Sequence, residues 1–157
     1  MWLIAVSGLV AATVVGAPTS WYLTRGLITI AHEGGHALAA LLTRRKLQGI
    51  RLHSDTSGVT LTRGKPTGLG MIITAAAGYV SPSLLGLGGA WLIAHGRVTL
   101  LLWGMLALLA AMLLLIRNLF GALTLLVVGA AVFALSWFTS PQTQAGVASL
   151  AVWFLLV

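Results

Sequence analysis

The chain has 157 residues, of which 59% are hydrophobic and only 7% charged, and it contains no cysteine. Apolar runs approaching or exceeding 18 residues recur along it, which indicates a polytopic membrane protein. The lack of cysteine excludes disulfides, thiolate metal sites and cysteine nucleophiles. The net charge of +7 does not indicate nucleic-acid binding, because six of the nine basic residues are concentrated in one loop at positions 44–65.

Hydropathy predicts an all-α bundle of about six transmembrane helices. They cover residues 2–17, 26–43, 68–94, 98–116, 118–138 and 144–157. Pro18 separates the first two spans, and Gly78 with Pro82 is expected to bend or break the third. Only Arg117 and Asn118 divide the fourth span from the fifth, so this pair either forms a very tight turn or lies within the membrane.

The second span contains the sequence ITIAHEGGHALAALL, which places the only glutamate of the chain, Glu33, between two histidines. Residues four apart lie on one face of a helix, so His32 and His36 can offer ring nitrogens to the same metal ion, and neutral imidazoles suit zinc. In H-E-x-x-H metallopeptidases the neighbouring glutamate takes a proton from water activated by the metal and later passes it to the leaving amine. The motif therefore favours a zinc site with Glu33 as the base.

The alternative for these histidines is a hydrogen-bonded packing role without metal. A charged side chain near the bilayer centre costs at least ~2.5 kcal/mol, and such residues usually face a cavity and mark function. Three ionisable groups at this spacing therefore favour the metal site. Gly34 and Gly35 each weaken a helix by up to ~1 kcal/mol relative to Ala, which is expected where another backbone, a substrate or a closely packed helix approaches.

The basic loop contains its own signal, the sequence GIRLHSDTSGVTLT. Apolar residues alternate on both sides of the turn-forming run at 54–58, which predicts a β-hairpin over residues 47–63 at the cytoplasmic membrane face. An isolated hairpin is marginal in water, so we expect it to lean on the bilayer surface or on the helices. A substrate helix must unwind before hydrolysis, and the extended segment is expected to pair with the hairpin edge.

The basic residues also orient the chain. If the loop at 44–65 is cytoplasmic, it and Arg117 place seven of the nine basic residues inside, leaving Arg25 and Arg97 on the other face. The N-terminus is then also cytoplasmic. We expect a multi-pass protein of a bacterial cytoplasmic membrane.

The two ends of the chain carry separate expectations. The first span lacks the basic region of a secretory signal and is interpreted as retained, while small residues at Gly16 and Ala17 leave cleavage open. The last span stops at Val157 without a polar flank. We therefore expect residues 1–157 to be a single integral-membrane domain that is truncated at its C-terminus.

Four segments carry a resemblance to a known family. They are HEGGHALAALL, DTSGVT, AAAGYVSPSLLG and IRNLFG, read along the chain. Over residues 20–138 the sequence resembles the compact bacterial branch of the site-two protease family of intramembrane zinc metallopeptidases. The resemblance implies a helical bundle with Zn²⁺ in the membrane interior, held by His32 and His36, that cleaves peptide bonds in or beside a substrate's transmembrane segment with Glu33 as catalytic base.

The chain departs from this family at the third zinc ligand. Family members take that ligand from an aspartate in a later span, whereas the only aspartate here, Asp55, lies in the predicted hairpin, where it suits a turn. Asn118 could offer an amide oxygen or hydrogen-bond the substrate, and a residue beyond Val157 is a third possibility. Two histidines with water would make a weaker site than three protein ligands.

Two functions from different classes follow from these observations. The first is a zinc-dependent intramembrane endopeptidase acting on membrane-protein substrates in the lipid bilayer. The second is a noncatalytic relative that serves as a membrane scaffold or as a subunit of a larger membrane complex. A small transporter is disfavoured, because no inverted repeat is evident and the charges are concentrated at one motif.

Overall fold

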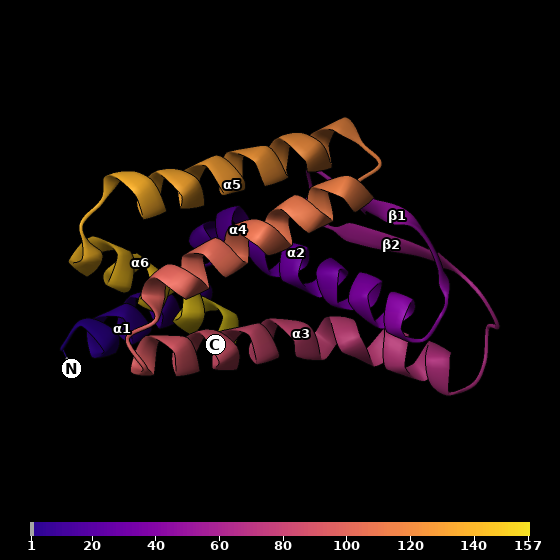
Figure 1. Ribbon diagram of the computed structural model, residues 1–157, viewed down its shortest axis with the longest axis horizontal. Coiled ribbons are helices and arrows are strands. Elements are labelled where there is room, and N and C mark those ends of the chain that lie inside the picture. Colours follow the sequence, from indigo (N-terminus) through magenta and orange to yellow (C-terminus); the bar gives the residue numbers. More distant parts are fainter. Residues whose placement is uncertain (1) are drawn as a thin grey trace.

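The computed structural model describes residues 2–157, which form six helices and one β-hairpin (Figure 1). In chain order the elements are α1 (Trp2–Gly16), α2 (Pro18–Leu42), β1 (Lys46–Leu52), β2 (Gly58–Arg63), α3 (Leu69–Ala94), α4 (Val98–Leu115), α5 (Leu119–Phe138) and α6 (Pro141–Leu156). Each predicted span therefore corresponds to a helix, and the predicted hairpin is present.

Two helices begin earlier than the hydropathy pattern predicted. α2 starts at Pro18, although the second span was expected to begin at residue 26. α6 starts at Pro141, where the Ser140 hydroxyl accepts a hydrogen bond from the Thr143 N–H at 3.3 Å. Proline fits the first position of a helix because its missing N–H would be unpaired there in any case. Each proline therefore marks the start of a helix.

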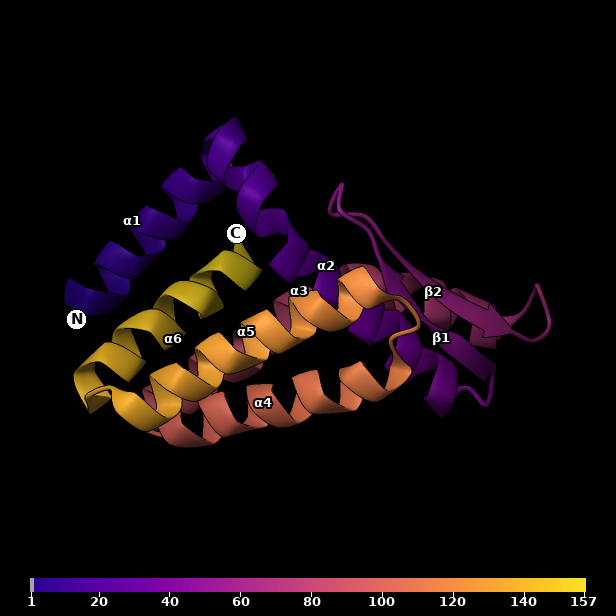
Figure 2. The ribbon, with the colours of Figure 1, turned by 90° about the horizontal axis from the view of Figure 1, so that it is seen from above.

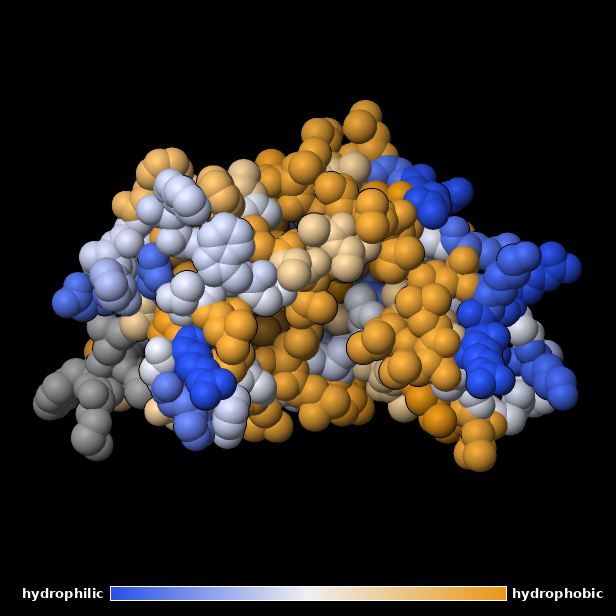
Figure 3. Space-filling view, viewed as in Figure 1, coloured by the Kyte–Doolittle hydropathy of each residue, from blue (hydrophilic) through white to orange (hydrophobic). Residues whose placement is uncertain are grey.

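Three helices of the described chain, α3, α4 and α5, are long and apolar enough to cross a membrane. α1 contributes a shorter apolar segment, Ala5–Gly16. α2 has 25 residues, but the polar side chains of its H-E-x-x-H motif and Arg25 lower its mean hydropathy. The surface is apolar over the middle of the molecule, and its hydrophilic residues gather mainly at one end (Figure 3). The chain is an integral membrane protein.

The helix connections divide between the two ends of the molecule (Figures 1 and 2). The basic loops before and after the hairpin lie at the same end as the α4–α5 turn, and the α3–α4 and α5–α6 connections lie at the other. The joint between α1 and α2 lies between these ends, and α1 begins at the same end as the α3–α4 connection. Together, α1 and α2 therefore run once from one end of the molecule to the other, with a bend between them. The sequence had predicted that each of them spans the membrane separately, with the N-terminus on the same side as the basic loop.

The third span was expected to bend or break at Gly78 and Pro82, and α3 continues unbroken through both residues. Proline has no N–H for the carbonyl four residues earlier, which belongs to Gly78. The Ser81 hydroxyl lies 3.1 Å from that oxygen and 2.8 Å from the Ala31 carbonyl oxygen of α2, so its single hydrogen is shared between the two acceptors. A hydroxyl that partly replaces the lost donor lets a proline remain inside a membrane helix.

Close packing of α2 on α3 explains one glycine of the motif. A Cβ on Gly35 would lie 2.2 Å from Ser81 Oγ and 2.8 Å from the Ala77 carbonyl oxygen, so only glycine allows this approach. A Cβ on Gly34 would meet only Met112 Sδ at 3.8 Å, which is an ordinary contact. The expected close backbone approach is therefore confirmed at Gly35.

The hairpin packs on the helices, as expected. Its strands are antiparallel, pairing from Lys46↔Arg63 to Leu52↔Gly58 with a register shift between Leu47 and Gly49. The fully buried Ile50 and its neighbour Leu52 join a core formed with α2, α4, α5 and the α4–α5 turn. This burial accounts for the stability that an isolated hairpin would lack.

The hairpin extends along the side of α2 (Figure 2), and its strand β2 lies over Glu33 of the H-E-x-x-H motif. The Thr29 hydroxyl donates to the Thr56 carbonyl at 2.8 Å, and Arg25 Nη2 donates to the Asp55 carbonyl at 2.8 Å. The turn of the hairpin therefore reaches the first half of α2. The alternation of apolar residues predicted the strands but not this position over the motif.

Candidate metal centre

The two motif histidines converge on one point. His32 and His36 lie one turn apart on α2, and their Nε2 atoms are 3.0 Å from each other. The rings meet edge to face, with centroids 4.5 Å apart. The helical spacing therefore brings both ring nitrogens to a single position, as the motif predicted.

The tautomer of His36 follows from its partner. His36 Nδ1 lies 2.7 Å from the Thr74 carbonyl oxygen, which can only accept, so Nδ1 carries the hydrogen. In the neutral ring, Nε2 then presents its lone pair toward His32. An Nδ1–H bond to a backbone carbonyl is the arrangement that orients metal-ligating histidines.

The convergent pair fits two positions of a tetrahedral zinc site. Zinc binds histidine nitrogens at about 2.0–2.1 Å, so two tetrahedral ligand atoms are about 3.3 Å apart. The observed separation of 3.0 Å between the two Nε2 atoms is close to that value, and small ring rotations cover the difference. His32 and His36 are therefore the residues that would hold the ion.

A glycine of α3 makes room for the histidine rings. A Cβ on Gly78 would lie 2.2 Å from His36 Nε2 and 2.4 Å from its Cε1. The ring of the next residue, Tyr79, meets the His32 ring edge to face, with centroids 5.0 Å apart. The close contact between α2 and α3 therefore shapes the space in which both rings sit.

Glu33 lies beside the histidines and is almost fully buried, with 4% of its surface exposed. The Thr60 hydroxyl of β2 lies 2.6 Å from Glu33 Oε2 and 3.1 Å from the Glu33 carbonyl oxygen. A Cβ on Gly58 would lie 2.6 Å from Glu33 Cγ, so β2 passes directly over this side chain. The hairpin thus holds the carboxylate in place and limits its contact with solvent.

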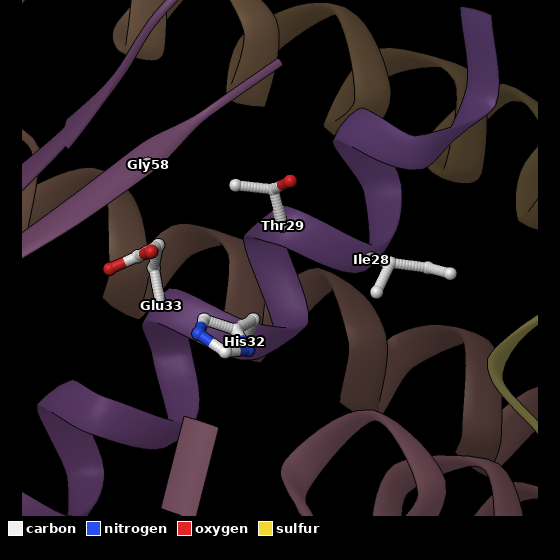
Figure 4. Close-up of a pocket in the computed structure, with 5 residues that line it drawn as sticks. All are labelled: Ile28, Thr29, His32, Glu33 and Gly58. Atoms are coloured by element: carbon white, nitrogen blue, oxygen red, sulfur yellow. The ribbon is translucent and has the colours of Figure 1, made fainter. Parts of the chain in front are cut away.

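The carboxylate and one imidazole line the same cavity (Figure 4). The cavity has a volume of about 280 Å³ and lies between α2 and β2. Its lining residues are Ile28, Thr29, His32, Glu33 and Gly58. An acid–base group, a candidate metal ligand and a strand backbone therefore border one space.

Asp55 belongs to the turn of the hairpin. Its Oδ1 accepts hydrogen bonds from the Ser57 hydroxyl at 2.6 Å and from the Ser57 N–H at 3.0 Å. These bonds, the side-chain one first, lower the pKa of the Asp55 carboxyl below its usual value. Within residues 2–157, no group of three His, Cys, Asp or Glu side chains gathers to hold a metal ion. The structure therefore does not bring Asp55 to the histidines.

Asn118 pairs with the hairpin backbone. Its Nδ2 donates to the Leu52 carbonyl at 2.6 Å, and its Oδ1 accepts from the Leu52 N–H at 3.2 Å. The Arg117 N–H donates to the Ile50 carbonyl at 2.9 Å, and Ile116 forms a parallel bridge with Ile50. The α4–α5 turn therefore occupies the outer edge of β1, and the Asn118 amide extends that edge.

Replacing Asn118 separates this role from that of a metal ligand. In Asn118→Asp, the carboxylate cannot donate to the Leu52 carbonyl, so we expect the free energy of unfolding to fall by about 1–3 kcal/mol. Thermal or denaturant unfolding in detergent measures this loss. A ligand role predicts the opposite, because a carboxylate binds zinc more strongly than an amide. A gain in zinc affinity without loss of stability would contradict the pairing role.

Three residues of the site carry no sequence signal strong enough to have been selected. Thr60 and Thr74 contact the motif from β2 and α3, and the Tyr79 ring meets His32 edge to face at 5.0 Å between centroids. The segments AAAGYVSPSLLG and DTSGVT, which carried part of the family resemblance, contain two of them, Thr60 and Tyr79. The resemblance therefore pointed to the right segments without assigning these roles.

Comparison with known families places the chain. The Peptidase M50B-like family model matches residues 5–157, which is nearly the whole sequence and includes every residue of the site. Neither the curated proteins nor the solved structures contain a match to the chain. The match agrees with the H-E-x-x-H geometry and with the resemblance to site-two proteases, and the chain therefore belongs to the Peptidase M50B-like family.

Proposed function

We propose that this protein is a zinc-dependent intramembrane endopeptidase that hydrolyses peptide bonds in or near the transmembrane segments of membrane proteins. The observation that carries the proposal is the convergence of the two histidine Nε2 atoms beside the buried carboxylate of Glu33. Family membership supports peptidase chemistry in general. We further propose that the protein lies in a bacterial cytoplasmic membrane with its basic loop on the cytoplasmic side.

Each polar residue of the site has a task in this reaction. A bound Zn²⁺ supplies Lewis acidity, which makes water a nucleophile near neutral pH. Glu33 accepts a proton from the attacking water and donates it to the leaving amine. The Thr60 hydroxyl keeps the carboxylate aimed into the cavity, and the Thr74 carbonyl keeps the His36 Nε2 lone pair directed toward His32.

The hairpin offers a place for an extended substrate. The outer edge of β1 is occupied by the α4–α5 turn, and among the described residues no strand pairs with the outer edge of β2. β2 passes over Glu33 and borders the cavity at Gly58. A substrate strand added to β2 would therefore bring its peptide bonds close to the catalytic base.

Proline substitutions along β2 test this mode of binding. Proline removes one backbone donor, and neighbouring residues of a strand point their N–H groups in opposite directions. Thr60 is left out, because its hydroxyl holds Glu33. Among positions 59, 61 and 62 we expect one alternate set to keep the hairpin intact and still lose cleavage by about tenfold. Zinc content and melting temperature identify that set. If every variant that keeps the wild-type zinc content and melting temperature also cleaved at the wild-type rate, substrate addition to β2 would be contradicted.

Removal of the metal tests the proposed chemistry. The full chain, reconstituted in liposomes with a protein that carries one transmembrane segment, is expected to cleave that segment. Treatment with 1,10-phenanthroline should abolish cleavage, and added Zn²⁺ should restore it, because the neutral imidazoles release the ion reversibly. Cleavage that is insensitive to the chelator would contradict a zinc mechanism, and a lack of cleavage of every membrane substrate offered would contradict a peptidase.

A further inference from the structure

A second cavity lies at the end of the molecule where the hydrophilic residues gather (Figure 3). It has a volume of about 350 Å³ and is formed by the loop after α2, the loop after β2 and the start of α3. Its lining includes Thr43, Arg44, Arg45, Lys65 and Thr67. No residue of the candidate metal centre borders it, so it is a separate feature of the fold.

The cations of this cavity lack an acidic partner. The chain has nine basic residues and only two acidic ones, Glu33 and Asp55. Glu33 is buried beneath β2 with Thr60, and Asp55 lies in the hairpin turn with its carboxylate bonded to Ser57. Neither acidic side chain is therefore available to neutralise Arg44, Arg45 and Lys65, and a bound anion would supply the missing countercharge.

The backbone and one guanidinium group add to the positive field. α3 begins at the cavity with Gly68 as its N-cap, and no side chain caps it. The first N–H groups of a helix and its dipole favour an anion. Arg45 Nη1 donates to the Lys65 carbonyl at 2.7 Å, which fixes the guanidinium between the two loops, while Arg45 Nε is buried without a partner among the described residues.

Apolar side chains border the same cavity and indicate which anion it takes. Leu69 and Met71 belong to the lining, and Leu69 is 76% exposed. Leu42, next to the lining residue Thr43, is also 76% exposed. A phospholipid presents an anionic phosphate next to acyl chains, and basic pockets at the ends of membrane helices bind such headgroups. Free phosphate would leave the leucines uncovered.

We propose that this cavity binds the phosphate headgroup of an anionic phospholipid, with Arg44, Arg45, Lys65 and the start of α3 as its partners and with the lipid chains covering Leu42 and Leu69. The inference is independent of the peptidase reaction. Bound lipid would join the loop after α2 to the loop after β2, and so would brace both the zinc-motif helix and the hairpin at one end.

Native mass spectrometry of the detergent-solubilised full chain tests the proposal, with phosphatidylglycerol and phosphatidylcholine as probes. We expect the chain to retain phosphatidylglycerol in preference to phosphatidylcholine. The double variant Arg44→Gln/Lys65→Gln should weaken phosphatidylglycerol binding by about 30-fold, since each cation near a lipid phosphate contributes about fivefold. It leaves Arg45 and its bond to the Lys65 carbonyl unchanged, so the loops should keep their fold.

A matched variant distinguishes lipid binding in the cavity from general attraction of anionic lipid by the net positive charge. Arg51→Gln/Arg97→Gln removes the same net charge from positions outside the cavity lining, and it should weaken binding by less than about threefold. Equal losses in both double variants would overturn the proposal in favour of diffuse attraction. Equal retention of the two lipids, or displacement of phosphatidylglycerol by inorganic phosphate at the same concentration, would also overturn it, the latter in favour of a free-phosphate site.

Discussion

The Glu33→Gln variant should lose about 100- to 10,000-fold in cleavage rate, which is the usual contribution of a general acid–base group. Glutamine has the same shape and keeps an oxygen that can accept from the Thr60 hydroxyl, whose bond to Glu33 is 2.6 Å long. The fold and the zinc content should therefore stay at wild-type level. A cleavage assay in liposomes, with metal analysis of the same preparation, measures both quantities.

Asp55→Asn provides the matched control, because Asp55 is the only other acidic residue of the chain. Its carboxylate bonds to Ser57 in the hairpin turn, so neutralising it should leave cleavage within about twofold of wild type. Loss of zinc in Asp55→Asn would show that Asp55 is a ligand and would contradict its assignment to the turn. Full activity in Glu33→Gln would contradict the assignment of Glu33 as the catalytic base.

The Gly78→Ala variant should lower zinc affinity by about 100-fold, the upper range for changes that disturb a ligand's surroundings. The added Cβ would lie 2.2 Å from His36 Nε2, so the ring must leave its position. A loss of zinc affinity could not come from a weaker helix, because alanine normally stabilises a helix by up to about 1 kcal/mol relative to glycine. Zinc titration of the purified variant measures the affinity.

Gly88→Ala on the same helix is the control for this substitution. A Cβ at Gly88 meets nothing within 4 Å, so the change should leave zinc affinity unaltered. Unchanged affinity in Gly78→Ala would mean that the histidine rings do not occupy the positions described above. A similar loss in both variants would indicate an effect on α3 as a whole.

The local pattern of the sequence predicted the parts of the site that lie within one element. The spacing of His32 and His36 determines that their rings share a face of α2, and the alternation around the turn determines the two strands. Hydropathy located all six helices, although α2 and α6 begin earlier than the apolar pattern predicted, at Pro18 and Pro141. These features depend on residues that are close together in the sequence, so the spacing of residue types is enough to predict them.

The contacts between elements could not be predicted in the same way. Thr74 lies 38 residues from His36, and no periodicity relates the two. The use of Asn118 as a partner of Leu52 depends on the α4–α5 turn meeting β1, 66 residues away in the chain. The same reason explains why Asn118 was considered a ligand, since a polar residue at a helix boundary has several possible partners.

Zinc stoichiometry in the purified full chain is the direct test of His32 and His36 as metal ligands. We expect about one zinc per wild-type chain, and little or none in His32→Ala and His36→Ala, because each variant removes one of the two convergent nitrogens. Circular dichroism would show that both variants remain helical. A wild-type chain that binds no zinc, or variants that retain it at the wild-type level, would contradict the assignment of these histidines as ligands.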